Sequence, residues 1–183
     1  MGGSLVALQK TFACHFCNRQ LLQNRLKQGD DMNKIAALIM KLQKLPCGLW
    51  LCSRAICFKA PYFGSINPLF TRLEPGLGEA RMKKRRRVQN HLGTVHAIAM
   101  ANLCELVAGT TLEITLPGTH RWIPKSMKID YVAKATTDVM AKTVIALNQP
   151  PDAGSVVVHV DVTDTAGKVV VTADIEMYVS KKK

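Results

Sequence analysis

Residues 93–108 read GTVHAIAMANLCELVA, and this stretch decides the fold. Beyond His96 its only polar side chains belong to Asn102 and Glu105, so a helix formed here has no polar face. A helix that is apolar on every side is normally buried on every side. Gly109 follows and is a natural stop for a helix. The stretch therefore predicts a central helix that other elements must enclose.

The chain after this helix supplies a sheet. Apolar and polar residues alternate there with a period of two, which indicates half-buried strands. The alternating runs cover residues 127–134, 139–147, 156–163 and 169–179. A proline-rich turn at 150–154 and a hairpin loop at 164–167 separate neighbouring runs. Strands joined in this way are antiparallel.

The chain before the helix predicts two short helices and two strands. Apolar residues at helical spacing predict a helix over 35–45 that Pro46 ends, and a second helix is expected over 49–58. Strands are expected over 66–73 and 78–88. Two strands, one buried helix and then three or four antiparallel strands form an α+β layout in which the sheet wraps around the helix.

The first part of the chain differs from the rest, because it is rich in Gln, Asn, Lys and Arg without a clean strand pattern. We expect residues 1–34 to be a flexible N-terminal extension and residues 35–183 to form one domain. Met32 opens the apolar periodic segment and is expected to be the native start. Cys14 and Cys17 have metal-like spacing, but no second pair completes a four-ligand set, so no metal is expected. Reduced thiols in a cytoplasmic protein are the expectation for the six cysteines.

The composition excludes global disorder, since 48% of the residues are apolar, and no apolar run approaches the length of a membrane span.

Lys plus Arg is 25 and Asp plus Glu is 13, which leaves a net charge of +12. Six of the seven residues Arg81–Arg87 are basic. Such a cluster predicts a polyanionic partner, or else a solvated edge that deters strand pairing. Nucleic acid is not expected, because the segment has no interleaved aromatic residues and no nucleic-acid signature.

The run Asn90-His91-Leu92-Gly93-Thr94-Val95-His96-Ala97 resembles the hotdog-fold acyl-CoA thioesterases of the phenylacetyl-CoA thioesterase type. Members of that family carry an Asn six residues before a His-Gly-Gly turn and an acid nine residues after the His; here Asn90 and Glu105 stand at those distances from His96. The chain departs from the pattern in two places, since Ala97 replaces the first Gly and Glu105 replaces the commoner Asp. The likeness spans about residues 35–179.

The resemblance implies a hotdog fold and an acyl-CoA substrate. It also implies a homodimer or a dimer of dimers, and no cofactor other than the coenzyme A of the substrate itself. Simple geometry points to the same assembly. Glu105 lies nine residues after His96, which is about 13 Å along a helix and on the opposite face. One chain therefore cannot bring both residues to one carbonyl, whereas a two-fold dimer can.

The candidate catalytic residues are Asn90, His96, Ala97 and Glu105. The N–H of Ala97 at the start of the helix is expected to stabilise an oxyanion. Glu105 is expected to activate water or to attack the thioester itself. Asn90 would orient the water or the substrate carbonyl.

Further residues are assigned to substrate binding. Gly93 and Thr94 belong to the loop before the helix, and Asn102, three residues before Glu105, is expected to hydrogen-bond it. Arg85, Arg86 and Arg87 suit the phosphates of coenzyme A.

Plainer alternatives stay open for these residues. Glu105 could be the structural partner of a Lys or Arg, and His96 could be a capping or core histidine. The whole protein could bind acyl-CoA without hydrolysing it, because a fold does not determine an activity. A hotdog dehydratase is a weaker alternative, on the spacing of His91 and Glu105. The apolar segment 35–58 could cover an acyl tunnel or touch a membrane surface, and the sequence does not choose between the two.

Overall fold

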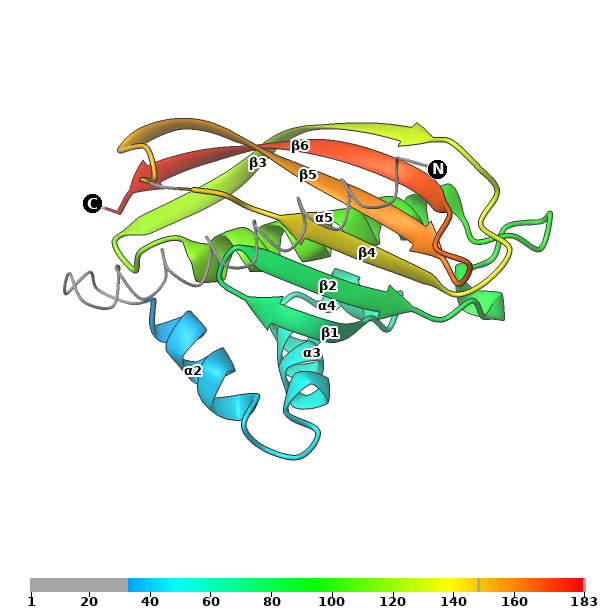
Figure 1. Ribbon diagram of the computed structural model, residues 1–183, viewed down its shortest axis with the longest axis horizontal. Helices are drawn as coiled ribbons and strands as arrows, with labels where there is room; N and C mark the ends of the chain where they lie inside the picture. Colours follow the sequence, from blue (N-terminus) through cyan, green and yellow to red (C-terminus); the bar gives the residue numbers. More distant parts are fainter. Residues whose placement is uncertain (1–32, 148, 183) are drawn as a thin grey trace, which may run out of the picture.

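In the computed structural model, residues 33–147 and 149–182 are described, and one antiparallel sheet bends around helix α5 (Ala97–Thr115) (Figure 1). The six strands run in the order β1-β2-β4-β5-β6-β3. Their bounds are β1 Leu69–Glu74, β2 Leu77–Met82, β3 His120–Tyr131, β4 Val139–Val144, β5 Ala153–Asp164 and β6 Val169–Lys181. Residues 1–32 lie outside the described part of the chain, and so do the expected extension, the Met32 start and the pair of Cys14 and Cys17.

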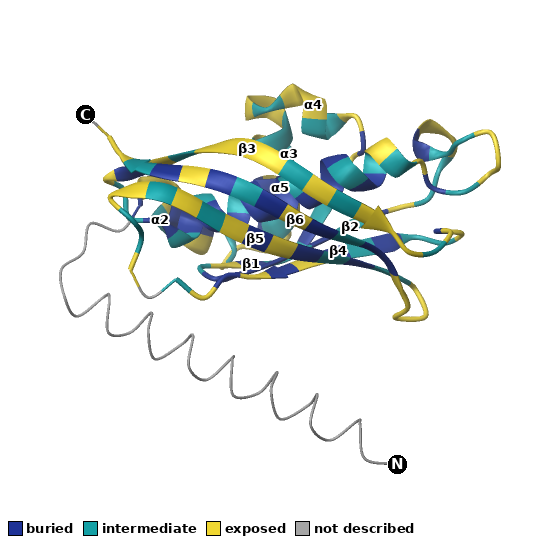
Figure 2. Ribbon diagram, turned by 90° about the horizontal axis from the view of Figure 1, so that it is seen from above, coloured by how far each residue is buried: buried dark blue, intermediate teal, exposed yellow. Residues whose placement is uncertain are grey.

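The longest strands show why the alternating sequence pattern predicts them correctly. Val158, Val160 and Val162 of β5 are buried against the helix, whereas His159 between them is exposed. Figure 2 shows the same alternation of buried and exposed residues along β5 and β6. Apolar side chains on one face of each of these strands therefore form the wall of the core that faces α5.

Strand β3 begins at His120, seven residues before the predicted start at 127. Its pairing with β6 shifts register between Pro124 and Ser126. A bulge places two residues opposite one and interrupts the period of two. Because the proline and the bulge interrupt the alternation, the sequence pattern does not predict the first half of this strand.

The strand predicted over 78–88 is too long, because β2 ends at Met82. Met82 pairs with Val139, the first residue of β4, so β4 does not extend far enough to continue the ladder. The N–H of Lys84 instead donates to Oδ1 of Asp138 at 2.9 Å, and residues Arg86–Val88 form a 3₁₀ turn, η1. The basic segment is thus a loop beyond the sheet and not part of a strand.

Helix α5 is longer than predicted, because Gly109 lies inside it instead of ending it. A Cβ atom at Gly109 would lie 2.5 Å from Cη2 of Trp122 on β3, so the glycine makes room for the indole ring. By length and composition alone α5 could cross a membrane, but it is the core helix, and 61% of its apolar window is buried. Its first turns are not enclosed on every side, since Ile98 is 57% exposed. The prediction of burial all round is therefore wrong at this end.

The N-terminal helices are α2 (Lys34–Leu42), α3 (Gly48–Lys59) and α4 (Pro61–Gly64), and the two predicted ones are confirmed. Asn33 caps α2, and its Nδ2 also donates to the carbonyl oxygen of Glu113 on α5 at 2.8 Å. Helix α3 packs on β1, where the N–H of Phe70 donates to Oγ of Ser53 at 2.9 Å. These bonds hold α2 against α5 and α3 against the sheet. Helix α4 lies beside α5, where Nδ2 of Asn102 donates to the carbonyl oxygen of Tyr62.

Candidate functional site

The start of α5 presents an unused hydrogen-bond donor. His96 caps the helix, and its carbonyl oxygen accepts the N–H groups of Ala99 and Met100 at 3.0 and 3.2 Å. The N–H of Ile98 donates to Nδ1 of His96 at 3.1 Å. Among the described residues nothing accepts a hydrogen bond from the N–H of Ala97. Because a helix N-terminus carries partial positive charge, this donor can receive a developing negative charge.

The capping interpretation of His96 is confirmed. Since Nδ1 accepts a hydrogen bond from Ile98, the neutral imidazole carries its proton on Nε2. The exposed ring therefore offers a donor, not a base, toward the space in front of the helix. The backbone of His96 is also anchored, because its N–H donates to the carbonyl oxygen of Val88 at 2.8 Å.

The loop that leads into α5 is organised by Asn90. Its Oδ1 accepts the N–H groups of Leu92 and Thr94 at 3.0 and 3.1 Å, and its Nδ2 donates to Oγ1 of Thr94 at 2.9 Å. Gly93 has φ of +71°, a backbone conformation that side chains disfavour. Within one chain Asn90, Gly93 and Thr94 therefore set the shape of the loop that presents His96 and Ala97.

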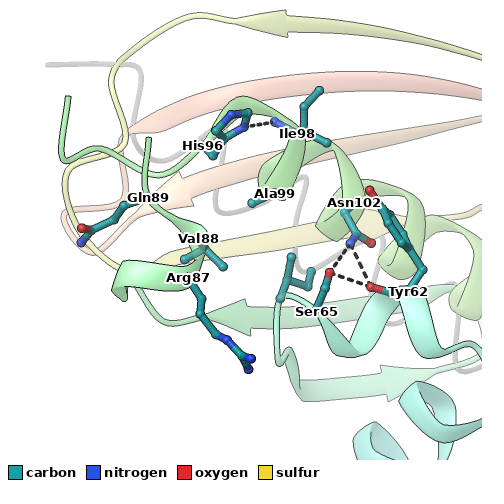
Figure 3. A pocket seen from close by; sticks show the side chains of 10 residues that line it. Tyr62, Ser65, Arg87, Val88, Gln89, His96, Ile98, Ala99 and Asn102 are labelled. Atoms are coloured by element: carbon teal, nitrogen blue, oxygen red, sulfur yellow. Dashed lines mark hydrogen bonds between the residues drawn. The ribbon is translucent and has the colours of Figure 1, made fainter. Parts of the chain in front are cut away.

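A pocket of about 210 Å³ opens beside the start of α5 (Figure 3). It brings together three of the residues predicted from sequence, namely His96, Asn102 and Arg87. The remaining lining comes from Ile98 and Ala99 on α5, Val88 and Gln89 before it, and Tyr62, Ser65 and Ile66 at and after α4. The last group was missed, because no local pattern in the sequence indicates that α4 packs on α5.

Asn102 lies on the wall of this pocket and is 6% exposed. Its Nδ2 donates to the carbonyl oxygen of Tyr62 and to Oγ of Ser65, both at 3.4 Å (Figure 3). The predicted hydrogen bond to Glu105 is therefore wrong, because the amide donates to Tyr62 and Ser65 instead. Oδ1 of Asn102 is buried without a partner among the described residues. A buried acceptor without a donor is costly, so this oxygen is suited to accept a hydrogen bond from a ligand or water.

Glu105 lies further along α5 and does not line the pocket. Its side chain is half-buried and forms no ion pair or hydrogen bond with any described residue. No Lys or Arg of the described residues therefore pairs with it. His96 lines the pocket at the start of α5 and Glu105 does not, as expected for residues nine positions apart on one helix. A single chain therefore does not bring these two side chains together.

The basic segment is not neutralised within the described part of the chain. No carboxylate there lies within ion-pair distance of the six Lys and Arg residues of Arg81–Arg87. Arg85 is half-buried, whereas Arg86 and Arg87 are exposed. Of the three arginines only Arg87 reaches the pocket. Arg87 thus brings a positive charge, unpaired among the described residues, to the wall of the pocket.

The buried cysteine of α5 offers no nucleophile. Burial, helped by the negative charge of Asp161, raises the pKa of the Cys104 thiol to about 12. The described residues also contain no group of three or more His, Cys, Asp or Glu side chains that could hold a metal ion. The chemistry available at the pocket is therefore that of backbone donors, amides and cations, with Glu105 at a distance.

The strand order, the sheet that wraps around one helix and the flanking N-terminal helices define a hotdog-fold protein. Residues 48–179 match the family described as "Domain of unknown function (DUF4442)", and the chain belongs to this family. The crystal structure of the genomics protein APC5556 is 42% identical, with a TM-score of 0.70, and the match covers 81% of this chain and 99% of that one.

More distant solved structures share the fold. The protein PA5026 of Pseudomonas aeruginosa, described as a probable thioesterase, is 20% identical with a TM-score of 0.67, over 75% of this chain and 97% of its own. The thioesterase HI1161 of Haemophilus influenzae is 13% identical with a TM-score of 0.59, and the match covers 66% of this chain and 82% of that one. No curated protein sequence matches the chain significantly.

Proposed function

We propose that this protein hydrolyses acyl-CoA thioesters. The observation that carries the proposal is the N–H of Ala97 at the start of a core helix, which no described residue accepts, with both of its neighbours, His96 and Ile98, lining the pocket. A thioester carbonyl placed there would direct its oxygen at this donor. The oxyanion that forms on attack would be stabilised more than the ground-state carbonyl, which is the condition for catalysis.

The reaction needs an attacking oxygen, and Glu105 either activates water to provide it or provides it from its own carboxylate. As a base it takes a proton from water, and the hydroxide adds to the carbonyl carbon. As a nucleophile its carboxylate adds instead and forms an anhydride that water then opens. In both routes the carbon–sulfur bond breaks, the thiolate of coenzyme A leaves and takes up a proton, and the free acid is released.

A second copy of the chain completes this site in the proposal, as a homodimer or a dimer of dimers. Among the described residues β3 is the last strand of the sheet, so none of them pairs with one of its edges. Ile123 and Tyr131 on β3 are 59% and 44% exposed, and the hydroxyl of Tyr131 donates to the carbonyl oxygen of Ala97 at 3.2 Å. The open edge therefore lies next to the start of α5. Pairing of two copies there supports delivery of Glu105 from one copy to Ala97 of the other.

Coenzyme A fits the charge around the pocket. It carries a diphosphate and a 3′-phosphate, and Arg85, Arg86 and Arg87 are cations without acidic partners in the described chain. Arginine binds phosphate through two parallel hydrogen bonds. The solved structures described as thioesterases share only the fold with this chain at their level of identity, and they support a thioester as substrate.

The test is to incubate the purified protein with a panel of acyl-CoA esters and a thiol reagent. We expect release of coenzyme A by the wild type and its loss in Glu105→Gln. Tight binding of the esters without released thiol would instead support a non-catalytic acyl-CoA carrier. Addition of water to an enoyl thioester would support a dehydratase.

The two routes for Glu105 are separated by a single turnover in ¹⁸O-labelled water. A base route places one labelled oxygen in every molecule of product acid. A nucleophile route transfers an unlabelled oxygen from Glu105 when water opens the anhydride at the Glu105 carbonyl, so part of the product acid lacks the label.

A further inference from the structure

The hairpin of α2 and α3 exposes an apolar surface that the proposed reaction does not use. Its tip, which we define as residues 44–51, contains Leu45, Trp50 and Leu51, whose exposures are 53%, 53% and 39%. Leu38 on α2 and Phe58 on α3 are 56% and 90% exposed. Large apolar side chains gathered in this way usually mark a surface that binds a partner.

The charge of the same hairpin has one sign. The chain contains no Asp or Glu between Asn33 and Leu73. Lys34, Lys41, Lys44 and Lys59 are exposed, and none of them forms an ion pair with a described residue. Two of them, Lys41 and Lys44, closely precede the exposed Leu45 in the sequence. Lysines without acidic neighbours beside exposed apolar side chains are typical of segments that lie on an anionic lipid surface.

The hairpin is held rigidly and points away from the sheet. Ala36, Ile39 and Cys52 are buried in the core, and Nε2 of Gln43 donates to the carbonyl oxygen of Leu73 at 2.5 Å. In Figure 1 the connection between α2 and α3 forms the lowest part of the molecule, beyond β1. The tip can therefore touch a flat surface without a change in the fold.

We propose that the α2–α3 hairpin docks this protein on an anionic membrane surface. The tip places Leu45, Trp50 and Leu51 among the headgroups and the first carbons of the acyl chains, while Lys41 and Lys44 face the lipid phosphates. Helices of 9 and 12 residues are too short to span a bilayer, so the contact is peripheral. The lack of any acidic residue on the hairpin favours an anionic surface over a second copy of this chain, whose hairpin carries the same positive charge.

The test uses the fluorescence of Trp50 in the full-length chain. The protein contains two tryptophans, so Trp122→Phe leaves Trp50 as the only indole. We expect vesicles of phosphatidylcholine mixed with phosphatidylserine to shift the emission to shorter wavelength and to pull the protein down on sedimentation. Vesicles of phosphatidylcholine alone, or high salt, should bind far less, because charges at a surface are screened.

Paired variants locate the contact. Lys41→Glu with Lys44→Glu should lower the vesicle partition coefficient more than about tenfold, since each lysine near an anionic surface contributes about 1 kcal/mol. Leu45→Ser with Leu51→Ser should lower it to a similar extent through lost apolar burial. The matched controls are Lys168→Glu, in the exposed turn between β5 and β6, and Val157→Ser, which is 64% exposed on β5. Neither control should change partitioning more than about twofold.

Three results would overturn the proposal. The first is equal binding to charged and uncharged vesicles, or none to either. The second is an equal loss in the control variants. The third is Trp50 emission that is already shielded from iodide without lipid, which would mean that residues 1–32 or a second copy cover the hairpin. Release of thiol from a soluble acyl-CoA ester should persist in all of these variants, so failure here is distinguishable from failure of the proposed hydrolysis.

Discussion

Substitution of Gly109 by Ala tests the packing of the core helix that carries the candidate site. The new Cβ would lie 2.5, 3.1 and 3.4 Å from three atoms of the Trp122 ring, whereas ordinary contacts begin near 3.4 Å. The indole cannot withdraw freely, because its Nε1 donates to Oε2 of Glu113 at 2.8 Å. Overpacking of this kind costs about 1–3 kcal/mol, and the better helix propensity of Ala returns about 1 kcal/mol.

The expected result is a net loss of up to about 2 kcal/mol, which lowers the Tm by up to roughly 8 °C for a domain of this size. Thermal and denaturant unfolding measure the change. The matched control is Trp122→Phe, which removes the ring atoms that the methyl group would strike. In that background Gly109→Ala should be neutral or stabilising by about 1 kcal/mol. If Gly109→Ala stabilises the protein with Trp122 intact, the close approach of the two elements is not real.

Three further predictions concern the site and the outer face of the sheet. Glu105→Gln should reduce thiol release by at least about a hundredfold with little change in Tm, and turnover at the wild-type rate would remove this residue from the mechanism. Neutralising Arg85–Arg87 together should raise KM for coenzyme A esters more than KM for short thiol esters without the nucleotide; an equal effect on both would argue against phosphate contact. On β5, the hydrogen bond from His159 to Asp174, at 2.7 Å, raises the pKa of the imidazole above its usual 6.5. The stabilisation is therefore complete below pH 6.5 and is lost as pH rises through the raised folded-state value. Asp174→Asn should flatten this dependence in a series of Tm measurements, and an unchanged pH profile would contradict the assignment.

The pattern of residue types along the chain determined most of the architecture. An apolar run without a polar face predicted the central helix, and alternation with a period of two predicted the strands that enclose it, because both patterns report directly which side chains avoid water. The spacing of Asn90, His96 and Glu105 likewise placed the acid away from the helix start. These inferences depend only on the geometry of a single helix or strand, so they can be made without knowing which segments pack against it.

The tertiary structure decided what each residue meets. Gly109 lies inside α5 because the Trp122 ring occupies the space that a side chain would need. Strand β2 ends at Met82 because its partner in the sheet, β4, begins at the residue that pairs with Met82. Nδ2 of Asn102 donates to the carbonyl oxygen of Tyr62 and not to Glu105. Asn102 therefore lies on the pocket wall, and its Oδ1 has no partner among the described residues. Such outcomes depend on contacts between segments tens of residues apart. A sequence pattern records how strongly a side chain avoids water, but only the folded chain determines which partner replaces the water.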